Sequence, residues 1–401
     1  MPATAAVAEF SIPTEAELLE RARQLTPALR ERASRTEDNR SLLPETLRDF
    51  VDAGFYRILQ PAKYGGYELP PLTLFKVAME LAKGCPSSAW CMSLIAVHNW
   101  EIALIDPQSA ADIWSEDPDA RASSSYAPFG KVTPVDGGYR ISGRWSWSSG
   151  SDHCSWVILG GVVPREGRDG PPDLRAFLIP RSDYEVVDVW HVLGLKGTGS
   201  NDIVVKDAFV PEHRTHQFAH SFMMADPGRA TFTSRNYRYP FGVVFAYSLS
   251  IVTLGMADGA LEAFKADMKV RLGAYDGAKA MEEPFVRHRL AEAEAIIRGL
   301  HARLEANFSE MDAPIDAGEA FPLDLRVKNK WDAQWIAKEA MKAVELLFKA
   351  SGARGIKLDS PMQRYFRDIH AASNHAFLNP DKGSLNAGLV QLGGMTTDFT
   401  L

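Results

Sequence analysis

The sequence predicts an α+β fold that is mainly helical and has three parts. Helical patterns dominate residues 1–118, the sequence alternates with period two from about 119 to 213, and long helical patterns occupy residues 214–401. We therefore expect an N-terminal helical domain, a central β-domain of antiparallel strands and a C-terminal helical bundle with those boundaries.

The N-terminal part carries signals for four helices. Thr14 and Glu17 have the spacing of a capping box, and an apolar stripe at helical spacing follows them. The second helix should begin at Pro44, because a proline in the first turn costs the helix no hydrogen bond. It should end near Gly54. Two more helices are expected between residues 71 and 105.

The β-domain is predicted from its alternation. In YRISGRWSWS (139–148), large or apolar residues take every second position, and the preceding Asp-Gly-Gly (136–138) is typical of a hairpin turn. A loop rich in Arg, Tyr and Gly is expected from about 214 to 242. The helical patterns then return, for instance in VRHRLAEAEAIIRGLHARLEANF and KWDAQWIAKEAMKAVELLFKASG.

Composition excludes several classes of function. A net charge of −7 with interspersed signs argues against a nucleic-acid surface. The chain has three cysteines, an odd number without CxxC spacing, which indicates reduced thiols and neither a disulfide framework nor a zinc site. The N-terminus lacks a targeting pattern, and no eighteen apolar residues follow one another. We expect a soluble, cytoplasmic protein without a membrane segment or a metal site.

Two motifs in the β-domain suggest a flavin site. They are SGRWSWSSGSDH (142–153) and LGLKGTGSNDIVVKDAFVP (193–211). A flavin is a flat apolar ring with a polar edge, and it needs an aromatic wall together with hydrogen-bonding groups. The alternative for the first motif is an ordinary strand with two buried tryptophans.

Both motifs resemble the flavin-binding strands of the acyl-CoA dehydrogenase superfamily. This resemblance implies that the cofactor-binding residues are Trp147, Ser148, Ser149, Gly197, Thr198, Gly199 and Ser200. Within this superfamily, the chain looks most like the oxygenase components of two-component flavin-dependent monooxygenases, such as the secosteroid phenol hydroxylases and the 4-hydroxyphenylacetate 3-hydroxylases. The resemblance runs from about residue 20 to 380. It is carried by AVHNW with His98, RASSSYAPFG with Ser124, WSWSSGSDH with Ser149 and QRYFRDIHAASNH with His375.

This resemblance implies a reaction. A separate NAD(P)H-dependent reductase supplies reduced flavin (FMNH2 or FADH2), dioxygen adds to it as a C4a-hydroperoxyflavin, and a phenolic ring is hydroxylated, ortho to its hydroxyl. Ser149 is expected to hold the flavin N5 hydrogen, and His98 to take the phenol proton, because histidine titrates near neutral pH. Ser124 is expected to bind the phenolic oxygen, and His375 to assist formation or protonation of the peroxide.

The same resemblance implies an architecture. It adds a four-helix bundle at the C-terminus, through which the chain would form a homotetramer. It also implies that Arg271 reaches a flavin phosphate, in its own site or in that of a neighbouring subunit.

Three other functions remain open at this stage. An acyl-CoA dehydrogenase needs a carboxylate base beside the flavin, yet residues 231–256 contain none, and residues 375–392 contain only Asp381 beside Lys382. A monooxygenase that oxidises nitrogen or sulfur should depend less on His98. A non-catalytic flavin-binding protein should hold the cofactor without turnover.

Three further patterns are weaker. His213, His216 and His220 have the spacing of one helical face, but with no carboxylate or thiolate evident beside them, a surface loop is the preferred interpretation. Gly197-Thr198-Gly199 lacks the third glycine of a dinucleotide loop, so no NAD site is expected. The basic residues Arg235 and Arg238 suggest a lid over an anionic substrate group, with solvated side chains as the alternative.

Overall fold

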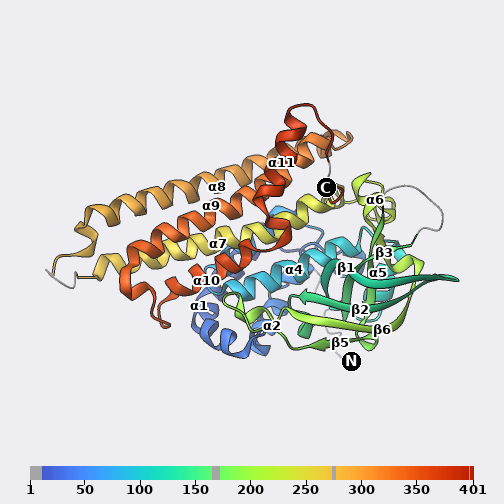
Figure 1. The fold of residues 1–401 in the computed structure, drawn as a ribbon, viewed down its shortest axis with the longest axis horizontal. Coiled ribbons are helices and arrows are strands. Elements are labelled where there is room, and N and C mark those ends of the chain that lie inside the picture. The colour runs from blue at the N-terminus through green and yellow to red at the C-terminus, as the bar shows by residue number, and fades with distance from the viewer. Residues whose placement is uncertain (1–10, 165–171, 273–276, 397) are drawn as a thin grey trace, which may run out of the picture.

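A computed structural model describes residues 11–164, 172–272, 277–396 and 398–401. Residues 1–10, on which the expected absence of a targeting segment partly rests, lie outside the described residues. The long helices of the C-terminal part form one end of the molecule and the sheet forms the other, with helix α4 between them (Figure 1). The mainly helical α+β class is confirmed.

The N-terminal part begins with the capping box that the sequence predicts, since Thr14 and Glu17 exchange both hydrogen bonds. The chain turns after α2 at Gly54, whose positive φ of 75° favours glycine. Every residue of α4 is buried, because this helix is covered by the sheet on one side and by helices on the others. The helices of this part are α1 (Glu15–Asn39), α2 (Pro44–Asp52), α3 (Pro71–Ala82), α4 (Pro86–Ile102) and α5 (Pro107–Trp114).

The central part is one seven-stranded sheet in the order β5-β6-β2-β1-β3-β4-β7. Its last strand lies just beyond residue 213, where we predict the β-domain to end. The strands are β1 (Ala122–Val135), β2 (Gly138–Ser148), β3 (Trp156–Val163), β4 (Asp173–Pro180), β5 (Tyr184–Val187), β6 (Asn201–Pro211) and β7 (Thr215–Gln217).

The expectation of purely antiparallel strands is wrong at one pair, because β1 and β3 run parallel. The predicted hairpin at 136–138 does join β1 and β2 in antiparallel register. A short 3-10 turn (Ser151–His153) then takes the chain to the other side of β1, so β3 runs in the same direction as β1. Period-two alternation marks strands but does not say which neighbours they pair with.

The C-terminal part is the expected four-helix bundle. The central helix α9 contacts the other three members, and α11 (Pro380–Gln391) packs on its side (Figure 1). The four helices are α7 (Phe241–Val270), α8 (Pro284–Ala317), α9 (Leu323–Gly355) and α10 (Pro361–Ser373).

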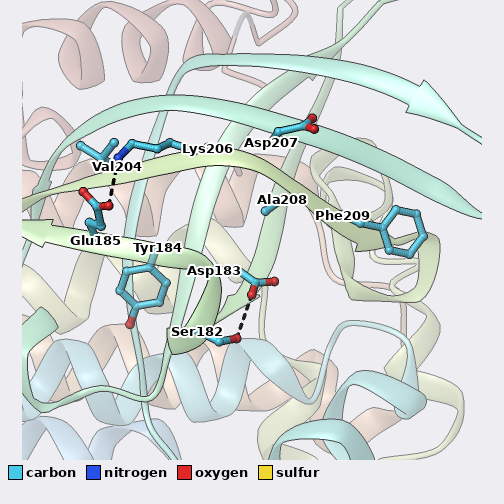
Figure 2. A pocket seen from close by; sticks show the side chains of 9 residues that line it. All are labelled: Ser182, Asp183, Tyr184, Glu185, Val204, Lys206, Asp207, Ala208 and Phe209. Carbon is cyan, nitrogen blue, oxygen red and sulfur yellow. Dashed lines mark hydrogen bonds and ion pairs between the residues drawn. The ribbon is translucent and has the colours of Figure 1, made fainter.

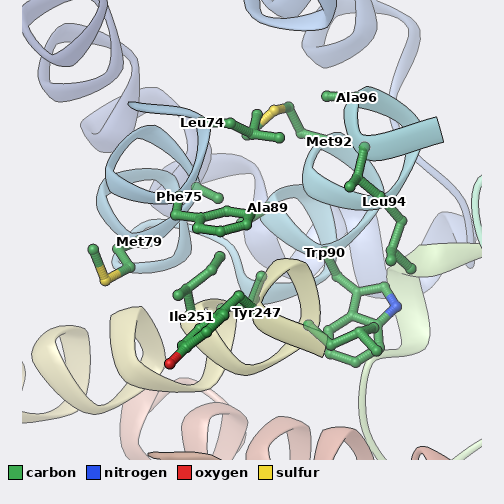
Figure 3. Close-up of a cluster of buried hydrophobic side chains, with 14 of the residues drawn as sticks. Leu74, Phe75, Met79, Ala89, Trp90, Met92, Leu94, Ala96, Tyr247 and Ile251 are labelled. Carbon is green, nitrogen blue, oxygen red and sulfur yellow. The ribbon is translucent and has the colours of Figure 1, made fainter. Parts of the chain in front are cut away.

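The main core joins the N-terminal helices to the bundle. Figure 3 shows side chains of α3 and α4, among them Phe75 and Trp90, packed against Tyr247 and Ile251 of α7. Helix α7 is long and apolar enough to cross a membrane, but 94% of its most apolar stretch is buried inside the protein. It is therefore a core helix, and its N-terminal half forms a rigid wall beside α4.

A pocket of about 380 Å³ lies on the sheet, along β5 and the distal half of β6 (Figure 2). Its lining is mostly polar and includes the Lys206–Glu185 ion pair at 2.9 Å and the hydrogen bond from Ser182 to Asp183. None of the expected cofactor-binding residues lines this pocket. The chemistry predicted from the sequence therefore belongs elsewhere.

Candidate active site

A continuous path of ring contacts links two of the predicted catalytic residues. From one end to the other, the ring centroids are separated by 5.9 Å between Trp90 and His375, 6.3 Å between His375 and Phe377, 4.9 Å between Phe377 and Phe245, and 5.9 Å between Phe245 and His98. The rings come from α4, α7 and the segment after α10. The fold thus brings His98 and His375 to one apolar-walled region.

The third predicted catalytic residue, Ser149, lies at the Trp90 end of this path. The Trp90 indole N–H donates to Ser149 Oγ at 3.2 Å. Ser149 follows β2 directly, and the backbone N–H of Gly150 binds the Thr198 carbonyl at 2.9 Å. This contact joins the two motifs that the sequence singles out.

A chain of hydroxyl groups fixes the hydrogen-bonding state of Ser149. Thr198 Oγ1 donates to the Leu195 carbonyl at 3.0 Å, so its single hydrogen is used there. It must then accept from Ser200 at 2.7 Å, and Ser200 must accept from Ser149 at 2.8 Å. With its own hydrogen committed and one lone pair taken by Trp90, Ser149 Oγ keeps one lone pair for a further donor.

The other flavin-site residues fall into two groups. Trp147 is 62% exposed, with its ring edge against Trp190 at 6.2 Å, so it offers a free aromatic surface at the end of β2. The alternative of two buried tryptophans is wrong, because only Trp145 of the pair is buried. Ser148 is buried and its hydroxyl donates to Ser123 at 2.8 Å, while Gly197 is buried and its N–H binds Ser87.

The left-handed backbone at Gly199 completes this loop. Its φ is 52°, and a Cβ there would come within 3.1 Å of the Ser41 and Asp152 side chains. Glycine lets the chain turn from the 3-10 helix Lys196–Thr198 into β6 at this point. The residues present therefore fit a flavin, with an exposed indole for its ring face, a hydroxyl acceptor for an N–H group, and small residues where the backbone must come close.

His375 is held as a neutral hydrogen-bond donor. Burial lowers the pKa of its imidazole to about 4, so the ring is uncharged at neutral pH. Its Nδ1 atom accepts the Phe377 backbone N–H at 3.3 Å. The single ring proton is therefore on Nε2, which can donate to an oxygen atom.

His98 has the opposite arrangement, because its Nδ1 atom faces an acceptor. Its Nδ1 atom lies 3.3 Å from the Glu101 carboxylate and 3.4 Å from the Tyr126 hydroxyl, while none of the described residues hydrogen-bonds Nε2. Burial and the adjacent Glu101 carboxylate raise the pKa of Tyr126 well above its ordinary value, so Tyr126 keeps its proton. The fourth predicted catalytic residue, Ser124, lies two residues before Tyr126 on β1, and its hydroxyl lowers the pKa of Tyr126 by less than burial and Glu101 raise it.

Arg271 is not brought to this region within one chain. It follows α7, whose 30 residues span about 45 Å, whereas the aromatic path touches the first turns of that helix at Phe245. Its guanidinium donates to the Ser351 carbonyl at 2.6 Å and lies 3.7 Å from Asp267. None of these contacts is with a residue of the two flavin motifs, so the role of Arg271, in its own site or in that of a neighbouring subunit, stays a prediction.

One of the weaker sequence interpretations is wrong. His216 does not lie on a surface loop, because it is buried and lies between the carboxylates of Glu101 and Asp226. The lid hypothesis stays a prediction: Arg235 pairs with Asp316 and Asp312 of α8, while the exposed Arg238 donates to the Ile315 carbonyl. No group of metal-ligand residues occurs in the described part of the chain.

Sequence reasoning missed Trp90, Tyr126 and Glu101. Tyr126 belongs to RASSSYAPFG, two positions after Ser124, so strand periodicity alone places both on one face of the sheet. Glu101 lies three residues after His98, a helical spacing that puts both side chains on one face. The partners of His216 could not be found this way, because they come from distant segments.

Comparison with known proteins decides the family. A family model described as the acyl-CoA dehydrogenase N-terminal domain matches residues 13–104, and one described as its C-terminal domain matches residues 247–380. The flavin-dependent monooxygenase oxygenase subunit HsaA of Rhodococcus jostii (strain RHA1) is 40% identical over 381 residues, covering 95% of this chain and 99% of the relative. This chain is an oxygenase subunit of the flavin-dependent monooxygenase family.

Two more comparisons agree with this assignment. The oxygenase component of p-hydroxyphenylacetate 3-hydroxylase from Acinetobacter baumannii is 32% identical, covering 96% of this chain and 90% of the relative. The crystal structure of 3-HSA hydroxylase from Rhodococcus sp. RHA1 superposes with a TM-score of 0.92 at 40% identity, covering 96% of this chain and 99% of the other. The family that the motifs predict is confirmed.

Proposed function

We propose that this oxygenase subunit hydroxylates a phenolic ring next to its hydroxyl group, using dioxygen and reduced flavin from a separate NAD(P)H-dependent reductase. The observation that carries the proposal is the pairing of two histidines in opposite hydrogen-bonding states across one aromatic-walled region. His98 has its Nδ1 atom against Glu101 and leaves Nε2 without a hydrogen-bond partner among the described residues, and His375 presents an Nε2–H. The relative named as p-hydroxyphenylacetate 3-hydroxylase supports this substrate class.

Reduced flavin supplies the two electrons that activate dioxygen for transfer. In this proposal, Trp147 contacts the flavin ring, and the free lone pair of Ser149 holds the N5 hydrogen in place. The rings around Ser149 and His375 exclude water, which protects the activated oxygen from release as hydrogen peroxide.

The protein's acid–base groups act on the substrate and on oxygen. His98 Nε2 takes the phenol proton, which makes the ring carbons richer in electrons and more reactive toward an electrophilic oxygen. Ser124 hydrogen-bonds the phenolic oxygen and keeps the ring in register with His98. His375 donates its Nε2 hydrogen to oxygen, and because its pKa is about 4 it does so as a neutral donor near pH 7.

Among the described residues, the carboxylate beside His98 does not suit acyl-CoA dehydrogenation. Glu101 is 1% exposed, accepts from Tyr126 and His216, and lies 3.3 Å from His98 Nδ1. It therefore lies behind His98 and cannot reach the α-carbon of a thioester. Oxidation of nitrogen or sulfur is the second candidate, and it needs no phenol base.

The test of this function is reconstitution with a reductase. The purified subunit should be nearly colourless and inactive with NADH alone, and it should convert phenols once a flavin reductase is added. Tightly bound FAD that NADH reduces directly would contradict the proposal. Equal turnover of His98→Gln and wild type on phenols, with turnover of a thioether or an amine, would favour the second candidate.

We further propose that the subunit forms a cytoplasmic homotetramer through the bundle. Arg271 follows the C-terminal end of α7 and is flanked by Val270 and Leu272, which are 80% and 55% exposed. A neighbouring subunit would cover these side chains and bring a flavin phosphate within reach of Arg271. Light scattering gives the oligomeric state, and Arg271→Ala should weaken flavin binding without unfolding the monomer.

A further inference from the structure

A buried line of alternating charges lies behind His98. The Glu101 carboxylate is 3.3 Å from His98 Nδ1 on one side and 2.9 Å from His216 Nδ1 on the other. His216 Nε2 is 3.2 Å from Asp226, which in turn binds Arg229 Nε at 2.6 Å. Apart from the partly buried Arg229, each of these residues is at most 3% exposed.

The contacts of His216 show that it is a cation. Both ring nitrogens face carboxylates, and its Nε2 also lies 2.6 Å from Ser221 Oγ, which donates its own hydrogen to Asp226. Both nitrogens must therefore carry hydrogens. Burial lowers the pKa of His216, but hydrogen bonds to Asp226 and Glu101 outweigh burial and raise it to about 9.

The Glu101 carboxylate remains ionised under the same influences. Burial raises its pKa, but hydrogen bonds from His216 and His98 outweigh burial and lower it to about 2. Two anions, Glu101 and Asp226, then face two cations, His216 and Arg229, so the network carries no net charge while His98 is neutral. Because these charges already balance, the proton on His98 stays on His98 and is not transferred to Glu101.

From this geometry we propose that Glu101 is a positioning residue for the reaction. Its carboxylate holds the His98 proton on Nδ1 and so leaves Nε2 free to accept the phenol proton, and the buried His216 keeps Glu101 charged for this task. The proposal rests on the proposed function of His98 as the base. It extends that function to a second layer of residues, which lie behind His98 and outside the substrate site.

The neighbours of Nδ1 decide the tautomer of His98. An ionised carboxylate only accepts hydrogen bonds, and a neutral imidazole has one donor nitrogen and one acceptor nitrogen. The Tyr126 hydroxyl donates its hydrogen to Glu101, so it can only accept from His98 Nδ1 at 3.4 Å, and Glu101 Oε2 lies 3.3 Å from the same nitrogen. Both oxygens therefore select the Nδ1–H tautomer of His98. The ring cannot turn freely, because it stacks on Phe245 at 5.9 Å and meets the edge of Tyr126 at 6.2 Å. Once His98 holds the substrate proton, the adjacent carboxylate stabilises the imidazolium.

A purely structural role for the network must be separated from this one. The network joins α4, β1, β7 and the segment around Asp226, so its loss could also loosen the fold. An ionised substrate separates the two roles, because a phenolate needs no base. A defect that acts through His98 should shrink with a phenolate, whereas a loosened fold affects both substrates.

The experiment compares Glu101→Gln and His98→Gln with wild type on two phenols at pH 8. One phenol is neutral at this pH, and the other carries an electron-withdrawing group and is mostly ionised. Glutamine keeps the shape of Glu101 but can donate to Nδ1 and so permits the wrong tautomer. We expect Glu101→Gln to lower hydroxylation of the neutral phenol by about 10²- to 10⁴-fold, and that of the phenolate by less than about 10-fold.

The chain offers a matched control. Asp112 on α5 forms a half-buried pair with His213 at 2.8 Å and also binds Arg214, so it has similar carboxylate–histidine chemistry outside the site. Asp112→Asn should leave the ratio of the two hydroxylation rates within about 2-fold of wild type. It calibrates the effect of losing a carboxylate–histidine contact that has no part in the reaction.

The outcomes separate this inference from the function on which it rests. If both His98→Gln and Glu101→Gln are selectively defective on the neutral phenol, both claims are supported. If only His98→Gln shows the pattern, Glu101 is not a positioning residue, although His98 is still the base. If His98→Gln hydroxylates the neutral phenol at the wild-type rate, the proposed base and this inference are both overturned.

A direct measurement covers the case in which Glu101→Gln does not fold. Solid-state NMR of wild-type protein with ¹⁵N-labelled histidine reports which nitrogens carry hydrogens, and His98→Gln identifies the His98 signals. We expect Nδ1–H and bare Nε2 for His98, hydrogens on both nitrogens for His216 at pH 7, and Nε2–H for His375 as an internal reference. A bare Nδ1 in His98 would overturn the inference.

Discussion

Replacing Ser149 with alanine should make the oxygenase lose its activated oxygen as hydrogen peroxide. The change removes the hydrogen bonds to Trp90 at 3.2 Å and Ser200 at 2.8 Å, and with them the lone pair that we assign to the flavin N5 hydrogen. One such bond contributes about 0.5 to 1.5 kcal/mol net, and more in a dry site, so peroxide release should accelerate about three-fold to a hundred-fold.

The assay follows oxygen consumption, peroxide and hydroxylated product with reduced flavin from a reductase. Ser149→Ala should still bind flavin and consume oxygen, but more of that oxygen should appear as peroxide. Ser125→Ala is the control, because it removes a different serine hydroxyl, one that lies in the sheet and is bonded to the Ser146 carbonyl at 2.8 Å. An unchanged peroxide fraction in Ser149→Ala, or an equal change in Ser125→Ala, would refute the assigned role.

Three further predictions concern flavin binding and stability. Trp147→Ala should raise the flavin Kd about 2- to 10-fold, and because its ring is 62% exposed the protein should lose little stability. Flavin titration measures the Kd, and chemical unfolding measures the stability. Trp145→Ala should instead lower the unfolding free energy by about 3–5 kcal/mol, because this ring is fully buried and donates to the Gly160 carbonyl. Burial raises the pKa of Asp368 to about 7, above its unfolded value of 3.8, so the native state binds the proton more tightly than the unfolded state does. The free energy of unfolding should therefore fall by about a few kcal/mol as pH rises from about 4 to 7. Urea unfolding at several pH values should show this slope in wild type and a flatter one in Asp368→Asn.

The order of helices and strands along the chain could be predicted from local patterns. The capping box at Thr14, the hairpin at 136–138 and the long helical patterns are all signals within a few residues, and the structure confirms them. The parallel pairing of β1 with β3 could not be predicted, because alternation specifies the buried face of a strand and not its neighbour. Alternation alone would bury Trp147 together with Trp145, but a register shift between Trp145 and Ser148 breaks the alternation and leaves Trp147 exposed.

The candidate site was only partly accessible from the sequence. Sequence motifs identify its four predicted catalytic residues, and the structure brings these residues to one region. They are His98, Ser124, Ser149 and His375. The charged partners behind them required three-dimensional information. The chemistry of His216 depends on carboxylates 115 and 10 residues away in the chain, and no local spacing reveals such a pairing.

The central claim is that this chain transfers one atom of dioxygen to a phenol. The direct measurement is mass spectrometry of the product formed from a neutral phenol under ¹⁸O₂, with NADH, flavin and a separate flavin reductase. The account predicts one ¹⁸O atom in a product hydroxylated next to the original hydroxyl, and no product when the reductase is omitted. A product that takes its new oxygen from water, or one that forms without the reductase, would contradict the account.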